Sequence, residues 1–487
     1  MKKNIKFIVI FCVIVVLLAG GLIALKLTAP EEAEEEKTEA EVTTQLLYDK
    51  NPRDIEKLTI ENEKGVYDID RKGEGDDARW FIADIANLPL SEQTLSSIIE
   101  NAASLTAQQT VVESAEDLSI YGLDKPSAKV TAAFSDSAGT VKTILVGNKT
   151  PKGTTRYVMV DGDPKVYTAY NTAMEYFLNG KYEIINRTVY TAKAAQSADD
   201  TTNYTRVNKM TISRADIDYD IVIEYDTRLD DPNAMVANSS SYVITEPVFR
   251  ELNPEKCSAV TEGIFGLTAS DLGVLNPNEE DMENYGINSP AAEITFEIGG
   301  GDVVNIKIGK EFIDEDGKKA GRFVYVDGIS IIYIFTEDSL PWLDVMPLDI
   351  VTTMFTGNYV YALSSVDITG AADLHLTIKG NSADDFEVFL NGEKTDDSAF
   401  KDLYQFILRA PSDELYFEET TAEPTVSVDI KTQDGGRDLI EFIPGEGRKS
   451  IIRLNGQSVY TCATSYVDRL VKNIELYMNG EEIITSW

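Results

Sequence analysis

The stretch that decides the fold is Tyr121-Gly-Leu-Asp-Lys-Pro126, which precedes the alternating strand Ala128–Phe134. The same pattern returns as Tyr285-Gly-Ile-Asn-Ser-Pro290, which precedes Ala292–Ile298. Motifs that recur in one order along a chain are the signature of a repeated structural unit. The sequence therefore predicts tandem copies of one module.

Short strands and tight turns follow the motif in both copies. The first copy continues with Ile144-Leu-Val-Gly147, Arg156-Tyr-Val-Met-Val-Asp161-Gly162 and Val166-Tyr167. The second copy continues with Ile306-Lys-Ile-Gly309, Arg322-Phe-Val-Tyr-Val-Asp327-Gly328 and Ile332-Tyr333. Asp-Gly between alternating strands is a hairpin signal, because glycine tolerates the positive φ that tight turns need. Each copy is therefore expected to contain a four-stranded meander.

A third copy is more divergent. It lacks the Tyr-Gly pair but keeps Pro424, the strand Thr425–Ile430 and the turn Asn455-Gly456. Each of the three copies is expected to close with a short helical stretch. These stretches are Thr172–Leu178, Asp338–Asp344 and Thr464–Leu476.

Each copy also has an earlier half, in which alternating strands precede an amphipathic helix. The opening strands are Ile55–Ile60, Val207–Ile212 and Val366–Leu374. Their expected partner strands are Gly65–Asp70, Tyr219–Tyr225 and Asp385–Leu390. The expected helices are Glu92–Gln108, one that starts at Asn253 and one that starts at Asp397.

Strands and helices are segregated within each copy, which favours an α+β fold with largely antiparallel sheets. We predict an N-terminal transmembrane helix followed by three tandem β-rich modules, each with one main helix and a short closing helix. The polar stretch Thr191–Asn203 is expected to link the first two modules. The predicted boundaries are 1–30 for the cytoplasmic lysines and anchor, 31–50 for an acidic linker, and 51–191, 203–358 and 359–487 for the modules.

The N-terminus has the pattern of an uncleaved membrane anchor. Lys2, Lys3 and Lys6 precede the uncharged run Phe7–Leu25, which as a helix spans the roughly 30 Å apolar core of a bilayer. A cleaved signal peptide usually has a shorter apolar region, so we favour the anchor. The lysines are expected to stay in the cytoplasm. The glutamate-rich stretch Glu31–Glu41 then begins an extracytoplasmic body, which suits a single-pass protein of a bacterial cell membrane.

The charge balance narrows the range of partners. The 82 acidic side chains outnumber the 44 basic ones, which gives a net charge of −38. A field of that sign repels phosphate backbones, so no nucleic-acid partner is expected.

Few residue types in the chain suit catalysis. The single histidine, His375, lies in an alternating strand, and no Gly-x-Ser-x-Gly elbow accompanies it. Cys257 and Cys462 are expected to be small buried hydrophobic residues, while Cys12 falls in the anchor. We therefore predict no catalytic, cofactor-binding or metal-ligating residue.

Carboxylates are plentiful, so functions other than a scaffold remain open. Asp216, Asp218 and Asp220 are expected to alternate along a strand, and Asp161 and Asp163 to flank a turn glycine. The loop Asp314-Glu-Asp-Gly317 lacks the spaced ligands and the distal glutamate of an EF-hand. A hydrolase that uses unidentified carboxylates therefore remains an alternative function. A calcium-binding or small-ligand-binding module is another.

The turn Tyr121–Pro126, followed by Leu145-Val-Gly-Asn148, Arg156–Asp163 and Val166-Tyr167, resembles the bacterial domain of unknown function 4340. The resemblance is strong over Leu47–Leu178, good over Tyr285–Phe335 and weak in the last module. It implies a single-span membrane protein associated with an ABC-type transport system of the gliding-motility kind. It implies no catalytic residues.

The function expected from these observations is that of a non-enzymatic extracytoplasmic scaffold or an accessory subunit of an ABC-type transport system. Its expected partners are the bilayer, through Phe7–Leu25, and a membrane protein such as a transporter permease. The permease is implied by the family resemblance alone.

The topology can be tested directly on cells. Protease added to intact protoplasts should digest the body of the protein, because the body is expected outside the membrane. Alkaline carbonate should not release the protein from membranes, because Phe7–Leu25 is expected to span the bilayer. A carbonate-soluble protein that starts near Pro30 would contradict the anchor.

Overall fold

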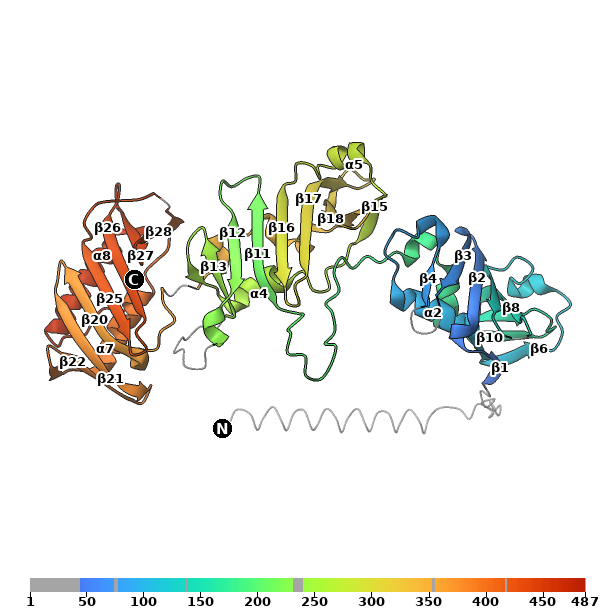
Figure 1. The fold of residues 1–487 in the computed structure, drawn as a ribbon, viewed down its shortest axis with the longest axis horizontal. Coiled ribbons are helices and arrows are strands. Elements are labelled where there is room, and N and C mark those ends of the chain that lie inside the picture. The colour runs from blue at the N-terminus through green and yellow to red at the C-terminus, as the bar shows by residue number, and fades with distance from the viewer. Residues whose placement is uncertain are drawn as a thin grey trace, which may run out of the picture. The chain divides into compact units, whose positions relative to one another are not determined.

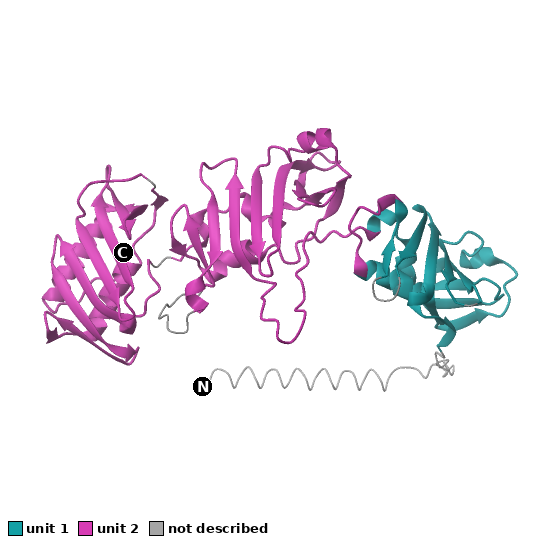
Figure 2. Ribbon diagram, viewed as in Figure 1, with its two compact units in different colours: residues 1–83, 93–183 teal, residues 84–92, 184–487 magenta. Residues whose placement is uncertain are grey.

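The computed structural model describes residues 44–73, 78–136, 138–230, 240–352, 355–416 and 418–486. The predicted anchor Phe7–Leu25, with Cys12, and the stretch Glu31–Glu41 lie outside these residues. No helix in the described part of the chain is both long and apolar enough to cross a membrane. The chain divides into two compact units (Figure 2). They are Met1–Ala83 with Gln93–Glu183, and Asp84–Glu92 with Ile184–Trp487.

The first unit contains an 8-stranded sheet, here called the first sheet (Figure 1). In spatial order its strands are β4 (Arg79–Phe81), β3 (Gly65–Lys72), β2 (Ile55–Asn62), β7 (Ala128–Phe134), β8 (Val141–Lys149), β9 (Thr155–Val160), β10 (Val166–Tyr170) and β6 (Gln109–Val112). The remaining elements named below are β1 (Gln45–Asp49), β5 (Ser104–Ala107), α2 (Glu92–Ala103), η4 (Leu118–Tyr121), α3 (Asn171–Met174) and η5 (Glu175–Leu178).

The second unit contains two 9-stranded sheets, of which the one earlier in the chain is called the middle sheet. In spatial order its strands are β14 (Arg250–Glu251), β13 (Tyr242–Glu246), β12 (Ile221–Tyr225), β11 (Val207–Arg214), β16 (Ala292–Ile298), β17 (Val303–Ile313), β18 (Lys319–Val326), β19 (Ile331–Phe335) and β15 (Asp271–Leu275). Its helices include α4 (Pro254–Glu262), α5 (Glu279–Asn284), η8 (Glu337–Ser339), η9 (Pro341–Leu343) and α6 (Pro347–Ile350).

The other sheet of this unit is called the C-terminal sheet. In spatial order its strands are β23 (Glu393–Lys394), β22 (Asp385–Leu390), β21 (Leu374–Ser382), β20 (Leu363–Gly370), β25 (Val426–Thr432), β26 (Arg437–Pro444), β27 (Lys449–Leu454), β28 (Gln457–Ala463) and β24 (Glu414–Leu415). Its main helices are α7 (Asp397–Leu408) and α8 (Thr464–Met478) (Figure 1).

The three sheets follow one order of strands. In each, two meanders start from a central antiparallel pair and run outward in opposite directions. The central pairs are β2–β7, β11–β16 and β20–β25. The connection between the meanders carries the main helix and an edge strand, which joins the last strand of the second meander. The predicted α+β fold with antiparallel sheets is confirmed.

Burial alternates along the central strands, as their sequence pattern predicts. Along β7, β16 and β25 every second residue is buried, beginning with the first. The residues between them are half-buried or exposed and mostly polar. Because successive side chains of a strand point to opposite faces, each sheet has one apolar face and one polar face.

The helices supply the other side of each apolar core. Helix α2 buries Leu95, Ile98 and Ile99. Asn253 precedes α4, and its side chain accepts a hydrogen bond from the backbone N–H of Glu255. Asp396 caps α7 in the same way. The predicted start of the second helix at Asn253 is therefore confirmed as a cap.

Three sequence-based predictions about elements are wrong in detail. The helix predicted over Glu92–Gln108 ends at Ala103, because Ser104–Ala107 pairs with β1 as strand β5. The opening strand of the third copy ends at Gly370, and His375 lies on the next strand, β21. Asp216, Asp218 and Asp220 lie in the β11–β12 turn rather than along a strand, since β12 begins at Ile221.

Every strand of the first sheet pairs with another strand of the first unit. We therefore predict that this unit folds alone. A fragment Gln45–Thr191 should unfold in one cooperative thermal transition, followed by circular dichroism. The matched fragment Gln45–Phe134 lacks β8, β9 and β10 and should remain unfolded. An unfolded longer fragment, beside a folded full chain, would show that the first sheet needs the second unit.

Candidate functional site

The repeated Tyr-Gly motif forms a turn that presses against a strand. Gly122 ends η4 with φ 67°, and Gly286 follows α5 and Tyr285 with φ 76°. The turn brings the Tyr121 carbonyl against Gly147 of β8, where a Cβ would lie 2.2 Å from that oxygen. In the middle sheet a Cβ on Gly309 would lie 2.3 Å from the Tyr285 carbonyl oxygen. Only glycine fits a backbone approach this close.

An aromatic contact fixes the tyrosine side of the motif. The Tyr121 ring lies edge-on to Tyr157, with centroids 5.0 Å apart. The Tyr285 ring lies against Phe323 at 4.5 Å. Both partners directly follow the motif arginine in the sequence. The turn is therefore packed onto the neighbouring strand as well as onto the glycine.

The motif arginines connect the strand that carries the close-approach glycine, β8 or β17, to the closing helical segment. Arg156 donates from Nη1 to the Gly147 carbonyl at 2.9 Å and from Nε to Asn171 of α3 at 2.9 Å. Burial lowers the pKa of Arg156. Arg322 donates to the Gly309 carbonyl at 3.4 Å and to Glu337 of η8 at 2.9 Å. The shared motif thus holds turn, strand and closing segment together, which is a structural role.

The C-terminal sheet shows what replaces the motif when Tyr-Gly is absent. Strand registers place Ile443 at the position of Gly309 and Ser450 at that of Arg322. Ile443 is fully buried. A side chain is therefore accommodated at the position where the other two sheets require a glycine.

The single histidine lies on the polar face of the C-terminal sheet. The His375 side chain is 56% exposed and contacts Asp367 on the adjacent strand β20. Asp367 also accepts from Lys431 at 3.1 Å. Burial opposes ionisation of Asp367, but the hydrogen bonds from His375 and Lys431 bring its pKa below the usual value. This arrangement is a surface row of cross-strand charge pairs.

The two described cysteines are free thiols in apolar cores. Cys257 lies on α4 and Cys462 on β28, and both are buried. Burial raises the pKa of both thiols, that of Cys462 to about 12. Since the thiolate is the nucleophilic form, neither environment favours reactivity.

Most of the carboxylates noted in the sequence accept hydrogen bonds from residues close to them in the chain. Asp216 accepts from Arg214 at 2.9 Å, and Asp163 accepts from the Tyr167 hydroxyl at 2.7 Å. Asp314 accepts from the backbone N–H groups of Asp316 and Lys318, which closes the β17–β18 turn. In the described ranges, no three His, Cys, Asp or Glu side chains gather as a metal-binding group.

A cleft of about 730 Å³ lies beside the motif of the middle sheet. Strand β18 supplies Lys319 and Arg322, and η8 supplies Glu337 and Asp338. The remaining lining residues are Ala215, Asp216, Ala291, Leu340, Pro341, Leu343 and Asp344. The cleft therefore joins an apolar lining to a set of charged groups.

The two cations of the cleft are already paired with carboxylates. Glu337 accepts from Lys319 at 2.6 Å and from Arg322 at 2.9 Å. The bond from Lys319 holds the pKa of Glu337 below its usual value, against the effect of burial and helped by Arg322. Lys319 also pairs with Glu311 at 2.9 Å.

Asp338 and Asp344 form no ion pair with another described residue, and both are exposed. The cleft is therefore net negative above an apolar lining. A lysine or arginine side chain suits such a site, because its aliphatic stem covers apolar surface while its head group reaches carboxylates.

The sequence did not identify this cleft. Arg322 was visible as a motif residue, and Asp338 and Asp344 bounded the predicted closing stretch. The pattern did not show that the β11–β12 turn, β18 and η8 enclose a common space.

Comparison with known proteins gives one match. Residues 80–239 match the family model described as Domain of unknown function (DUF4340). This part of the chain is therefore similar to DUF4340, the family that the sequence motifs resemble. The match includes the first Tyr-Gly motif and ends before β13, so the copy at Tyr285 lies outside it. No curated protein and no solved structure matches the chain.

The structural role of the motif predicts the effect of a single methyl group. Gly309→Ala should destabilise the middle sheet by roughly 1–3 kcal/mol, since the added Cβ meets a backbone oxygen that cannot move freely. Urea unfolding followed by fluorescence of the buried Trp342, with the other tryptophans replaced by phenylalanine, measures the loss.

Val303→Ala is the matched control on the same strand. Val303 is 67% exposed, so this change should stay within about 0.5 kcal/mol. Equal stability of the Gly309→Ala and Val303→Ala chains would contradict the close-approach explanation.

Proposed function

We propose that the chain is a membrane-anchored, non-enzymatic scaffold outside the bacterial cytoplasm, and an accessory subunit of an ABC-type transport system. In this proposal the three sheets are three copies of one module, as their common strand order suggests. The anchor is the run Phe7–Leu25. A tether of this kind raises the effective concentration of partners in the same membrane.

The observation that carries the proposal is the cleft of the middle sheet. Its cations are paired within the cleft, whereas Asp338 and Asp344 face solvent without a cationic partner among the described residues. Such a cleft favours a basic segment of another protein. The net charge of −38 supports the same choice, because a field of that sign attracts basic partners over a longer range.

The geometry favours contact through module surfaces over addition of a strand to a sheet edge. Of the six outermost strands, β14, β23 and β24 each hold 2 residues, β4 holds 3, β6 holds 4 and β15 holds 5. Short edge strands offer few free backbone groups and discourage pairing with another chain. A basic external loop of the transporter permease is therefore the proposed partner.

Removing two carboxylates from the cleft tests this proposal. The double variant Asp338→Asn/Asp344→Asn should reduce recovery of transporter subunits about tenfold, after crosslinking in membranes and pull-down of the tagged protein. Recovery from the unchanged chain should fall as salt rises, because exposed charge pairs are screened.

The matched control is Glu315→Gln/Asp316→Asn, which removes the same charge from the exposed β17–β18 turn. This control should leave recovery unchanged. Equal loss of recovery in both variants would show that the effect depends on net charge and not on the cleft. Recovery of no membrane protein with the unchanged chain would contradict the proposal.

A further inference from the structure

A short segment leaves the edge of the middle sheet and returns to it. Residues Pro247–Arg250, here called the strap, follow β13 and end in β14. Strand β14 is held to β13 by the pairs Val243–Glu251 and Ile244–Arg250. Both ends of the strap are therefore fixed to the middle sheet.

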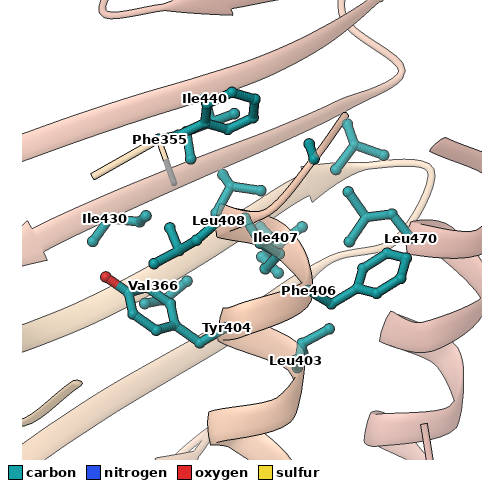
Figure 3. Packing of buried hydrophobic residues seen from close by; sticks show 14 of the residues in the cluster. Phe355, Val366, Leu403, Tyr404, Phe406, Ile407, Leu408, Ile430, Ile440 and Leu470 are labelled. Atoms are coloured by element: carbon teal, nitrogen blue, oxygen red, sulfur yellow. The ribbon is translucent and has the colours of Figure 1, made fainter. Parts of the chain in front are cut away.

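The centre of the strap lies in the core of the C-terminal sheet. Val248 is fully buried and belongs to the apolar cluster formed by the strands of that sheet with α7 and α8. Phe355, which follows the middle sheet in the chain, belongs to the same cluster. Figure 3 shows Phe355 beside Ile440 of β26 and near Leu408, the last residue of α7. The backbone N–H of Phe355 donates to the Leu408 carbonyl at 3.0 Å.

Arg250 closes the strap with a buried charge. Its side chain is 2% exposed and donates to the carbonyls of Phe355 at 3.3 Å and Thr352 at 3.2 Å. Its guanidinium lies 4.9 Å from the Phe355 ring centroid and 5.4 Å from that of Tyr460 on β28. Removing a charge from water is costly unless such contacts compensate, so the buried guanidinium depends on Thr352 and Phe355, which follow the middle sheet in the chain, and on Tyr460 of the C-terminal sheet.

A further contact supports the same junction from the C-terminal sheet. Gln457 of β28 donates to the Pro247 carbonyl at 3.4 Å. The strap therefore meets the C-terminal sheet through its apolar core, through a buried guanidinium and through a peripheral amide. A flexible connection between independent domains is expected to make few contacts of this kind.

We propose that the strap makes the middle and C-terminal sheets one cooperative folding unit with a fixed joint. The C-terminal sheet then lacks part of its core whenever the middle sheet unfolds, because Val248 leaves with it. The two sheets consequently present their surfaces to partners at a fixed spacing. This inference does not depend on the proposed partner or on the cleft.

The two buried thiols report the two sheets separately. Cys257 lies on α4 beside the middle sheet, and Cys462 lies on β28 of the C-terminal sheet. The full chain is equilibrated in detergent at increasing urea and pulsed with a thiol reagent. The label on each cysteine peptide is then measured by mass spectrometry, which separates both from Cys12. In the unchanged chain the two thiols should become labelled at the same urea concentration.

Leu470→Ala tests whether the unfolding transitions of the two sheets are coupled or only happen to occur at the same urea concentration. Leu470 is a fully buried α8 residue in the core of the C-terminal sheet. Its truncation should shift the labelling midpoints of Cys462 and Cys257 together to lower urea. A shift of Cys462 alone would overturn the proposal.

Val248→Asp should separate the two transitions, with Cys462 labelled at lower urea than Cys257. Phe249→Asp places the same group at the neighbouring strap residue, which is 48% exposed, and should leave the transitions coincident. If Val248→Asp prevents folding, Val248→Ala should give a smaller separation of the same sign. Transitions that stay coincident in a folded Val248 variant would also overturn the proposal.

Discussion

Each sheet depends on one antiparallel pair of strands at its centre, where the two meanders meet. The residues that face each other there are Ile60 and Val130, Ile212 and Ile294, and Ile368 and Val428. All are at most 1% exposed. A slip of one residue would turn these side chains to the polar face, so the register is strongly determined. Every other strand takes its position from this pair, including those that carry the Tyr-Gly contact and the cleft.

The strands of the central pairs could be predicted from the sequence because their signals are local and repeated, but their pairing with each other emerges only from the structure. Alternation along Ala128–Phe134 and Ala292–Ile298 identified the strands, and the Asp-Gly turns identified the hairpins. The helix predicted to Gln108 was wrong at its end because Leu105 and Ala107 fit both periodicities, and only pairing with β1 selects a strand. The two-residue edge strands escaped prediction because they are defined by their neighbours rather than by their own pattern.

The cleft and the strap could not be derived from the sequence for the same physical reason. Each depends on residues that are distant along the chain and carry no distinctive pattern. Val248 reads as an ordinary loop valine, yet it fills part of the core formed by residues 363–483. Asp338 and Asp344 read as polar ends of a short helix, and their lack of ion-pair partners emerges only from the folded arrangement. The Tyr-Gly motif, in contrast, could be recognised in the sequence because its residues are consecutive and form the turn themselves.

The central functional claim is that the chain works by contact through the cleft of the middle sheet. The most direct measurement places a photo-crosslinking amino acid at Leu343, which lines the cleft, and illuminates living cells. The same amino acid at Val303, which is exposed on β17, serves as the reference position. The account predicts an adduct with a membrane protein from position 343 and none from position 303. No adduct at 343, or the same adducts from both positions, would contradict it.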